Sequence, residues 1–453
     1  MNKAQILFAG GAESVTGANF LLTYKNTKLL VDCGLEQGSK MAEETNWEAF
    51  PYNPAEVQAL VVTHAHLDHI GRIPKLIQDG FRGDIYSTPA TREIVAVMLT
   101  DTIKILGQSK SHPELVDMYN EKNLKKALSM WKVKNYHEEF SIGDVDIIFK
   151  DAGHILGSVM AQMQVGSKKV LFTGDLGNSP SLILKDTEEI ADIDYMVMES
   201  VYGDRNHEER ESREENLLKV INEAHKGGGT LLVPTFSLER TQEMLYMLNN
   251  FAEKGLLPSM PIYVDSPLAI RVTRIFRSNT DILNDEATAV LTHDDDLYGF
   301  PGLKETLKVW ESKAINRDHG PKMIIAASGM SEGGRIVHHE KRYLGDPNTI
   351  VLFTGYQAEN TAGRKIQDGL ETVEIMGEDV SVRAKIRTVS GFSGHKDSDH
   401  LVEFVEQVSG SIKTVFLAMG ELKASTFLAQ RLKGELGVNT RVVQKEEVVE
   451  FEV

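Results

Sequence analysis

Short apolar runs, each about as long as a β-strand, fill much of the first part of the chain. The runs AQILFAG, NFLLTY, TKLLVDCG and VQALVVTH predict four strands. A helical pattern follows from about Pro89 to Met130, and strands are predicted again at VDIIFKDAGH, SVMAQMQVG, KKVLFTGD and YMVMES. Close strands without intervening helices, followed by helical segments, predict a layered α/β domain in which one sheet packs on another.

The pattern changes after Glu199. The charged run from Asp204 to Glu215 predicts a solvated linker or the start of a helix. Strands then alternate with helices: GGTLLVPTF, PIYVDSP, KMIIAASG and TIVLFTGYQ are each followed by a helical segment, which predicts a doubly wound parallel sheet. Short strands return from about Val373. We therefore expect one domain, over residues 204–372, inserted into another, over residues 1–203 and 373–453.

Composition narrows the classes of function. The 453 residues carry 49 basic and 66 acidic side chains, a formal net charge of −17. A protein that captures nucleic acid by bulk positive charge does not have this balance. The single cysteine, Cys33, excludes a disulfide framework and a cysteine-ligated zinc cluster. The N-terminal run predicts a buried strand rather than a signal peptide, and no apolar run approaches the ~20 residues of a membrane span. We expect a cytoplasmic protein.

The sharpest chemical signal is VVTHAHLDHIGR, which places His64, His66, Asp68 and His69 in HxHxDH spacing just after a predicted strand. Neutral imidazole and carboxylate are ligands of zinc and similar divalent ions. A polar loop whose histidines cap the next helix would explain one such residue, but not the whole cluster. The motif therefore predicts a metal site.

Other strand ends supply further ligands. His154, Asp175 and His395 each follow a β-rich run beside a glycine, although each alone is an ordinary turn or loop residue. We expect His64, His66 and His154 to hold one ion, with Asp68, His69 and His395 holding a second. Asp175 would lie between the ions, where a bridging carboxylate lowers their mutual repulsion. Asp32, in LLVDCG, is expected to orient a ligand histidine from behind.

HxHxDH with the later His, Asp and His resembles the metallo-β-lactamase fold superfamily. The runs ESVYGD, PTFSLERTQE, DSPLA, ASGMSEGGR, GYQAEN and GFSGHKD are similar to its β-CASP branch, which includes cleavage and polyadenylation endonucleases and their bacterial ribonuclease relatives. The resemblance runs from about Gly10 to Glu421. It implies a four-layer αββα fold with an inserted β-CASP domain, and nuclease activity. Spacing alone indicates only a dinuclear metallohydrolase.

The resemblance also implies catalytic residues. Its marker acid in ESVYGD falls on Glu199, and the histidine of its late SGH run falls on His395. Two positions depart from the family pattern: Lys365 stands where eukaryotic members carry histidine, and Met419 replaces the histidine of an HGE run. Both departures concern the general acid, for which Glu199, His395 and Lys365 are candidates.

Serine, glycine and arginine follow several strands of the predicted insert. Ligands bind at the carboxyl ends of strands in a doubly wound sheet, near helix N-termini that favour anions, and arginine adds bidentate phosphate contacts. The alternative is ordinary helix capping and surface arginine. We expect phosphate contacts above all at ASGMSEGGR; the candidate residues are Ser328, Gly329, Arg335, Arg240 and Arg271. The paired His338 and His339 are expected to be packing or surface residues.

Together with the resemblance, which implies nuclease activity, these features predict a zinc-dependent ribonuclease. We expect two zinc ions to lower the pKa of a bound water, which would then attack phosphorus in line, positioned by Asp68 and Asp175. The 3′ oxygen leaves, so internal cleavage yields a 5′ phosphate and a 3′ hydroxyl. Manganese can replace zinc at such a mixed site.

Other functions stay open. The same metals could hydrolyse single-stranded DNA, a small ester or a thioester, although the large insert favours a polymer. A non-catalytic scaffold is disfavoured because every ligand position is filled. We expect RNA to bind in a cleft between the domains, with no membrane partner; a homodimer is left open.

Overall fold

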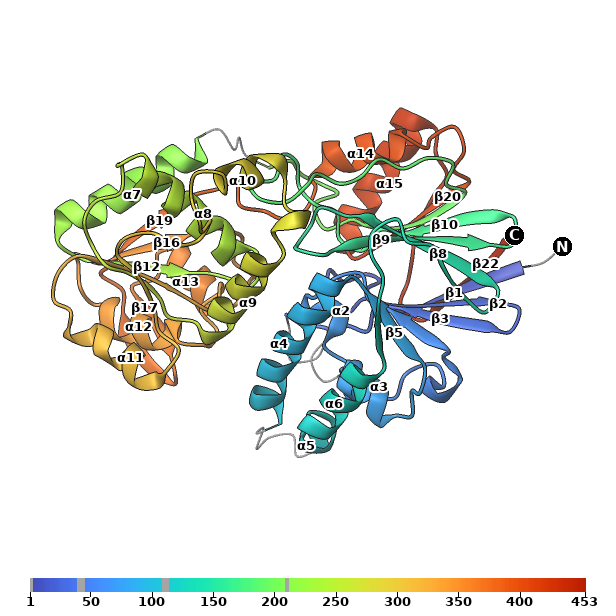
Figure 1. Cartoon of the computed structure of the whole chain (residues 1–453), viewed down its shortest axis with the longest axis horizontal. Helices are drawn as coiled ribbons and strands as arrows, with labels where there is room; N and C mark the ends of the chain where they lie inside the picture. The colour runs from blue at the N-terminus through green and yellow to red at the C-terminus, as the bar shows by residue number, and fades with distance from the viewer. Residues whose placement is uncertain (1–2, 39–44, 108–113, 208–211) are drawn as a thin grey trace. The chain divides into compact units, whose positions relative to one another are not determined.

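The computed structural model describes residues 3–38, 45–107, 114–207 and 212–453 (Figure 1). The chain divides into two compact units. The first unit comprises Met1–Asn206 and Gly394–Val453, and the second, here called the insert, comprises His207–Ser393.

Two seven-stranded sheets form the centre of the first unit. Their inner faces share one core, in which Phe8 and Phe20 meet Phe172 and Phe416. The first sheet has the order β22 (Glu447–Glu452), β1 (Lys3–Gly10), β2 (Asn19–Tyr24), β3 (Thr27–Val31), β4 (Ala59–Val61), β5 (Asp84–Ser87), β6 (Trp131–Val133). The second has the order β21 (Thr440–Val442), β20 (Thr414–Ala418), β11 (Tyr195–Glu199), β10 (Lys168–Phe172), β9 (Val159–Val165), β8 (Val145–Asp151), β7 (Phe140–Ile142).

Helices cover the outer faces of both sheets. On the second sheet, α14 (Ser398–Glu406) and α15 (Leu422–Leu436) bury Leu401, Phe404 and Leu428 against Leu171 and Met196. The helices on the side of the first sheet are visible at the lower edge of this unit in Figure 1. They are α2 (Leu67–Ile70), α3 (Ile73–Gln78), α4 (Pro89–Leu106), α5 (Glu114–Met118) and α6 (Glu121–Ser129). A short 3₁₀ turn, η1 (Pro54–Glu56), precedes β4. The arrangement confirms the predicted four-layer αββα fold.

The insert contains a six-stranded sheet whose paired strands are all parallel. Its order is β14 (Leu303–Glu305), β13 (Ile262–Val264), β15 (Lys322–Ala326), β12 (Thr230–Pro234), β16 (Ile350–Phe353), β19 (Lys385–Thr388). Helices lie on both faces (Figure 1). They are α7 (Arg213–Gly227), α8 (Arg240–Glu253), α9 (Pro267–Ser278), α10 (Asp285–Val290), α11 (Val309–Ala314), α12 (Ile336–Tyr343) and α13 (Ala362–Gln367), with the 3₁₀ turns η2 (Thr280–Ile282) and η3 (Ile315–Arg317). The doubly wound parallel sheet predicted from the alternating pattern is therefore present.

The end of the insert differs from the expected boundary at residue 373. The hairpin of β17 (Thr372–Ile375) and β18 (Glu378–Ser381) packs with the insert, and Val373 and Ile375 join its core. β19 then pairs in parallel with β16, which extends the insert's sheet. The short strands after Val373 therefore complete the insert, and the chain returns to the first unit at Gly394.

The helical stretch expected from Pro89 to Met130 is divided into α4, α5 and α6, and its residues 108–113 lie outside the described part of the chain. The charged run from Asp204 precedes α7, with residues 208–211 also outside it. None of the helices in the described residues is both long enough and apolar enough to cross a membrane.

Candidate metal centre

The ends of five strands of the first unit bring the side chains of the candidate metal centre together. β3 and β4 run parallel, so Asp32 and the HxHxDH segment leave the first sheet at the same edge. In the second sheet, β10 and β11 are parallel, and Asp175 and Glu199 stand at or just beyond their carboxyl ends. His154 follows β8. Polar groups at the strand ends thus converge without interrupting the apolar sheet interior.

Three histidines and one oxygen of Asp175 form the first group, whose ligand atoms all lie within 4.8 Å of one another. Nδ1 of His66 is 3.1 Å from Nε2 of His64 and 3.2 Å from Nε2 of His154. Oδ2 of Asp175 is 3.4 Å from Nε2 of His64 and 3.5 Å from Nε2 of His154. Three imidazoles and one carboxylate are a donor set suited to a tetrahedral zinc ion.

A second group consists of Asp68, His69 and Asp175. Nε2 of His69 is 3.4 Å from Oδ1 of Asp175 and 3.7 Å from Oδ2 of Asp68. Asp175 therefore presents Oδ2 to the first group and Oδ1 to the second. One carboxylate shared in this way is the arrangement expected for a bridging ligand.

Hydrogen bonds on the outer side fix the histidine rings. Nδ1 of His154 lies 3.0 Å from the carbonyl oxygen of Gly394, so it donates its proton there and leaves Nε2 for a metal. Nδ1 of His69 lies 2.7 Å from Oδ2 of Asp32, in the position predicted for that carboxylate. Nδ1 of His64 is 3.0 Å from Oγ1 of Thr63.

Thr63 is a site residue that sequence reasoning missed. Its hydroxyl also donates to Oδ2 of Asp32 at 2.7 Å, and its backbone N–H donates to Oδ1 at 2.8 Å. One residue thus connects Asp32 to the first ligand histidine. The available signal was a hydroxyl residue directly before His64, at the end of an apolar strand.

Burial and neighbouring histidines set the protonation states of the first group. Burial lowers the pKa of His64, and it lowers the pKa values of His66 and His154 well below the ordinary value of histidine. Burial opposes ionisation of Asp175, but His69 and His64 hold its pKa well below the usual range. Neutral imidazoles around an ionised carboxylate are the forms that bind a divalent cation.

Two buried atoms at the centre have no hydrogen-bond partner among the described residues: Nε2 of His69 and Oδ1 of Asp175. Buried polar atoms are normally paired, because leaving one unpaired costs free energy. A cation between these two atoms would satisfy both. The residues present therefore fit a divalent metal centre.

His395 lies elsewhere than expected. The sequence predicts it at the second ion with Asp68 and His69, but its ligand atoms group with Asp175 and Glu199 instead. Its Nδ1 is 3.0 Å from Oε2 of Glu199 and 4.0 Å from Oδ2 of Asp175. Burial lowers the pKa of His395, yet the Glu199 carboxylate outweighs this and raises it to about 10. His395 thus forms an ion pair with Glu199 at the edge of the centre, and the second group keeps three protein ligands.

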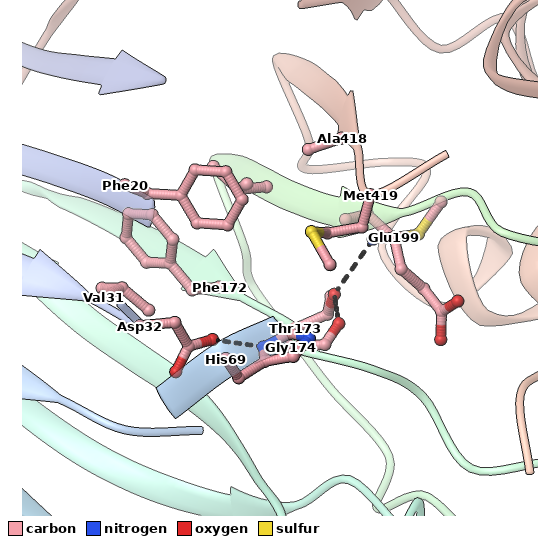
Figure 2. A pocket seen from close by; sticks show the side chains of 12 residues that line it. Phe20, Val31, Asp32, His69, Phe172, Thr173, Gly174, Glu199, Ala418 and Met419 are labelled. Carbon is pink, nitrogen blue, oxygen red and sulfur yellow. Dashed lines mark hydrogen bonds and ion pairs between the residues drawn. The ribbon is translucent and has the colours of Figure 1, made fainter. Parts of the chain in front are cut away.

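A small cavity borders His69 of the second group (Figure 2). Phe20 and Phe172 form its apolar wall, whereas Asp32, His69 and Glu199 reach its polar side. Figure 2 shows the thioether of Met419 in the same cavity. The position of the family's HGE histidine thus supplies a soft, apolar side chain here.

Gly34 allows the metal-binding loop to approach the first sheet closely. A Cβ atom at this position would lie 1.5 Å from the carbonyl oxygen of Asp68. That carbonyl accepts the N–H of Ala18, and the carbonyl of His69 accepts the N–H of Cys33 at 2.7 Å. Any larger residue at Gly34 would displace Asp68 and His69.

Arg335, the main phosphate-binding candidate, points into the insert. Its Nη1 donates to Oδ1 of Asp265 at 2.6 Å, and its two amino groups also donate to the carbonyls of Thr306 and Leu307. Asp265 is completely buried and also bonds to Nε2 of His339 at 2.7 Å. The structure therefore favours an internal ion pair over a phosphate contact at Arg335, and it confirms packing for His339.

The remaining candidates differ in exposure. Arg240 donates from Nη1 to the carbonyl oxygen of Thr354 at 2.6 Å, which directs its guanidinium inward. Ser328 is half-buried and its hydroxyl accepts the N–H of Glu332, while Gly329 is buried. Arg271 is half-buried on α9, and Lys365 is exposed on α13. All five belong to the insert.

Comparisons with known proteins agree with this architecture. Three family models match the chain: the metallo-beta-lactamase superfamily over residues 15–224, the Beta-Casp domain over 241–366, and the Zn-dependent metallo-hydrolase RNA specificity domain over 379–443. A solved structure of a protein of unknown function from Enterococcus faecalis covers 99% of this chain and 100% of its own, with a TM-score of 0.57 and 13% identity. That likeness concerns the fold alone.

Curated relatives match over most of the chain. Ribonuclease TTHA0252 of Thermus thermophilus is 36% identical over 397 residues, which are 88% of this chain and 89% of that protein. Transcription termination factor FttA of Methanosarcina mazei is 30% identical, covering 97% of this chain and 70% of its own length. An RNase J-like protein of Methanocaldococcus jannaschii is 30% identical, covering 96% and 97%. The chain belongs to the β-CASP family of the metallo-β-lactamase superfamily.

Proposed function

We propose that this protein is a metal-dependent ribonuclease that cleaves RNA internally with two divalent ions, preferably zinc. The observation that carries the proposal is the position of Asp175. Its Oδ2 lies near the first group of candidate ligands, and its Oδ1 lies near the second. Relatives named as a ribonuclease and as an RNase J-like protein support RNA as the substrate. We also propose the cytoplasm as its location; a homodimer stays an open prediction.

His64, His66, His154 and Asp175 would hold the first ion, and Asp68, His69 and Asp175 the second. Divalent ions bound there supply a Lewis acid for the phosphodiester and lower the pKa of an attacking water. Manganese is a plausible substitute, because the second group contains two carboxylates and one imidazole. The three-ligand group should bind its ion more weakly than the four-ligand group.

The Glu199–His395 pair is positioned to act as the general acid. Glu199 is buried and its Oε1 accepts the N–H of Leu176, which fixes the carboxylate. Nδ1 of His395 faces this carboxylate at 3.0 Å, and its side chain stays 24% exposed. The pair can hold a proton at the edge of the centre and release it to a leaving 3′ oxygen, which gives a 5′ phosphate and a 3′ hydroxyl. Lys365, another candidate for the general acid, belongs to the insert, whereas Glu199 and His395 both belong to the first unit.

The experiment is a substrate panel with metal analysis. Purified protein should retain about two zinc ions per chain and cleave structured RNA. Its activity on single-stranded DNA, a small phosphoester and a thioester should be much lower. Preferred turnover of the thioester or of DNA would favour the alternative hydrolases. A metal-to-protein ratio near zero in protein purified with zinc supplied would remove the proposal altogether.

A further inference from the structure

Three neighbouring strands of the insert end at one edge of its sheet. The strand order places β12 between β15 and β16, and all three run parallel. Pro234 of β12 pairs with Ala326 of β15, and Leu232 pairs with Val351 of β16. The loops that begin just beyond these rungs therefore emerge side by side, at the carboxyl edge where doubly wound sheets bind ligands.

Two of these loops expose aromatic rings. Phe236, two residues beyond β12, is 44% exposed, and Tyr356, three residues beyond β16, is 55% exposed. The strands beneath them are buried throughout. Apolar rings exposed on neighbouring loops are of the kind that serves contact with another molecule.

Phe236 is held in place from below by the third loop. A Cβ atom on Gly329 would lie 2.9 Å from Cδ2 and Cε2 of the Phe236 ring, so only glycine lets the ring pack this closely. The carbonyl oxygen of Phe236 accepts the hydroxyl of Thr241 at 2.6 Å. The N–H of Thr235 donates to Ala326 at 3.0 Å. One part of the ring is thereby fixed while the rest faces solvent.

The loop that carries Tyr356 is hydrogen-bonded to Gly329. Gln357 is buried, and its Nε2 donates to the carbonyl oxygen of Gly329 at 3.0 Å and to that of Tyr356 at 3.3 Å. Nη1 of Arg240 donates to the carbonyl of Thr354. These hydrogen bonds connect the Tyr356 loop to Gly329, against which the Phe236 ring also packs.

We propose that Phe236 and Tyr356 form a stacking platform for the bases of single-stranded RNA. The inference rests on the proposed ribonuclease function and adds a substrate-binding site in the insert. Stacking suits this chain because a net charge of −17 limits bulk attraction of phosphates, whereas every base offers a π-face to an aromatic ring. Rings whose backbone is fixed in advance lose little conformational freedom on binding.

The test compares ring removal here with ring removal elsewhere in the insert. Trp310, on α11, is 65% exposed and serves as the matched control. Phe236→Ala and Tyr356→Ala should each raise KM for single-stranded RNA about tenfold, with kcat unchanged. Phe236→Trp and Tyr356→Phe should retain wild-type KM, and Trp310→Ala should have no effect. Thermal unfolding should be the same for all variants.

A second readout reports stacking directly. Full-length Asp68→Asn protein, which should leave the oligonucleotide intact, is titrated with RNA containing 2-aminopurine. Stacking should quench the fluorescence of 2-aminopurine. Introducing Phe236→Ala or Tyr356→Ala into the Asp68→Asn protein should reduce this quenching. Wild-type KM and quenching in both alanine variants would overturn the platform while leaving the ribonuclease proposal intact. Wild-type protein that neither binds nor cleaves RNA would instead remove the proposed function.

Discussion

Oδ2 of Asp32 lies 2.7 Å from Nδ1 of His69, and both side chains are 1% exposed. The pair turns Nε2 of His69 toward Asp175, where it has no hydrogen-bond partner among the described residues. Asp32 is therefore placed to orient a histidine of the candidate metal centre, and it belongs to none of the groups of ligand atoms itself.

Asp32→Asn should lower the affinity for the more weakly held divalent ion about 10- to 100-fold. Asparagine suits the position because Asp32 has a φ of +59°, a backbone conformation that asparagine tolerates. Chelator competition on metal-free protein would measure the change. Asp146→Asn, at an exposed site in the same unit, is the control. Equal affinities in both variants would mean that Asp32 does not support the ligand.

Asp68→Asn should reduce RNA cleavage at least about a hundredfold and leave the fold intact. The side chain is 19% exposed on a loop helix, and the backbone contact of its carbonyl with Ala18 does not depend on the carboxylate. One ion should remain on the four-ligand group. The measurements are kcat/KM, metal content and thermal unfolding. A folded variant with wild-type turnover would refute the assignment.

Arg335→Ala should destabilise the insert by about 3–5 kcal/mol, because it leaves the buried Asp265 carboxylate without its cationic partner. Arg274→Ala removes only a surface pair with Glu305 and should cost less than about 1 kcal/mol. Denaturant unfolding of the full chain measures both. Unchanged stability together with a defect confined to RNA would restore the phosphate-binding role expected from the sequence.

Glu340 should make the stability of the insert depend on pH. Burial raises its pKa from the ordinary 4.5 to about 7, and its carboxyl bonds to the hydroxyl of Ser331. Between these pH values the folded chain keeps a proton that the unfolded chain has lost, so stability falls as pH rises from about 4.5 to about 7. Glu340→Gln should remove about 3 kcal/mol of this decline. Parallel curves for wild type and variant, measured by urea unfolding, would contradict the assignment.

The sequence predicted the layers of the fold and most of the side chains that the structure brings together at the candidate metal centre, and it did so for a physical reason. Apolar strands closed by His, Asp or Gly specify where polar loops leave a sheet, and parallel strands bring such loops to one edge. The sequence therefore groups His64, His66, His154 and Asp175, and their ligand atoms all lie within 4.8 Å of one another. The resemblance to the β-CASP branch supplied the identity of the insert and of Glu199, which spacing alone does not give.

The sequence did not predict in which direction the side chains of Arg335 and His395 point. The residue pattern at ASGMSEGGR fits a phosphate loop and an internal ion pair equally well, because burial of Asp265 beside Arg335 arises from strands distant in sequence. His395 follows a glycine-rich loop that could have reached either ion, and only its 3.0 Å approach to Glu199 separates it from His69. The domain boundary expected near Val373 differs from the one at Ser393 for a related reason. The sequence of a short strand does not indicate which sheet it joins.

The most direct test of the account is metal-dependent hydrolysis of end-labelled RNA. Wild-type protein should produce internal fragments with 5′ phosphate ends, lose this activity when its ions are chelated, and regain it when zinc or manganese is restored. Metal content would be recorded on each sample. Cleavage that persists in ion-free protein, or metal-replete protein that leaves RNA intact, would contradict the assignment of Asp175 and its surrounding histidines as the centre of a metal-dependent ribonuclease.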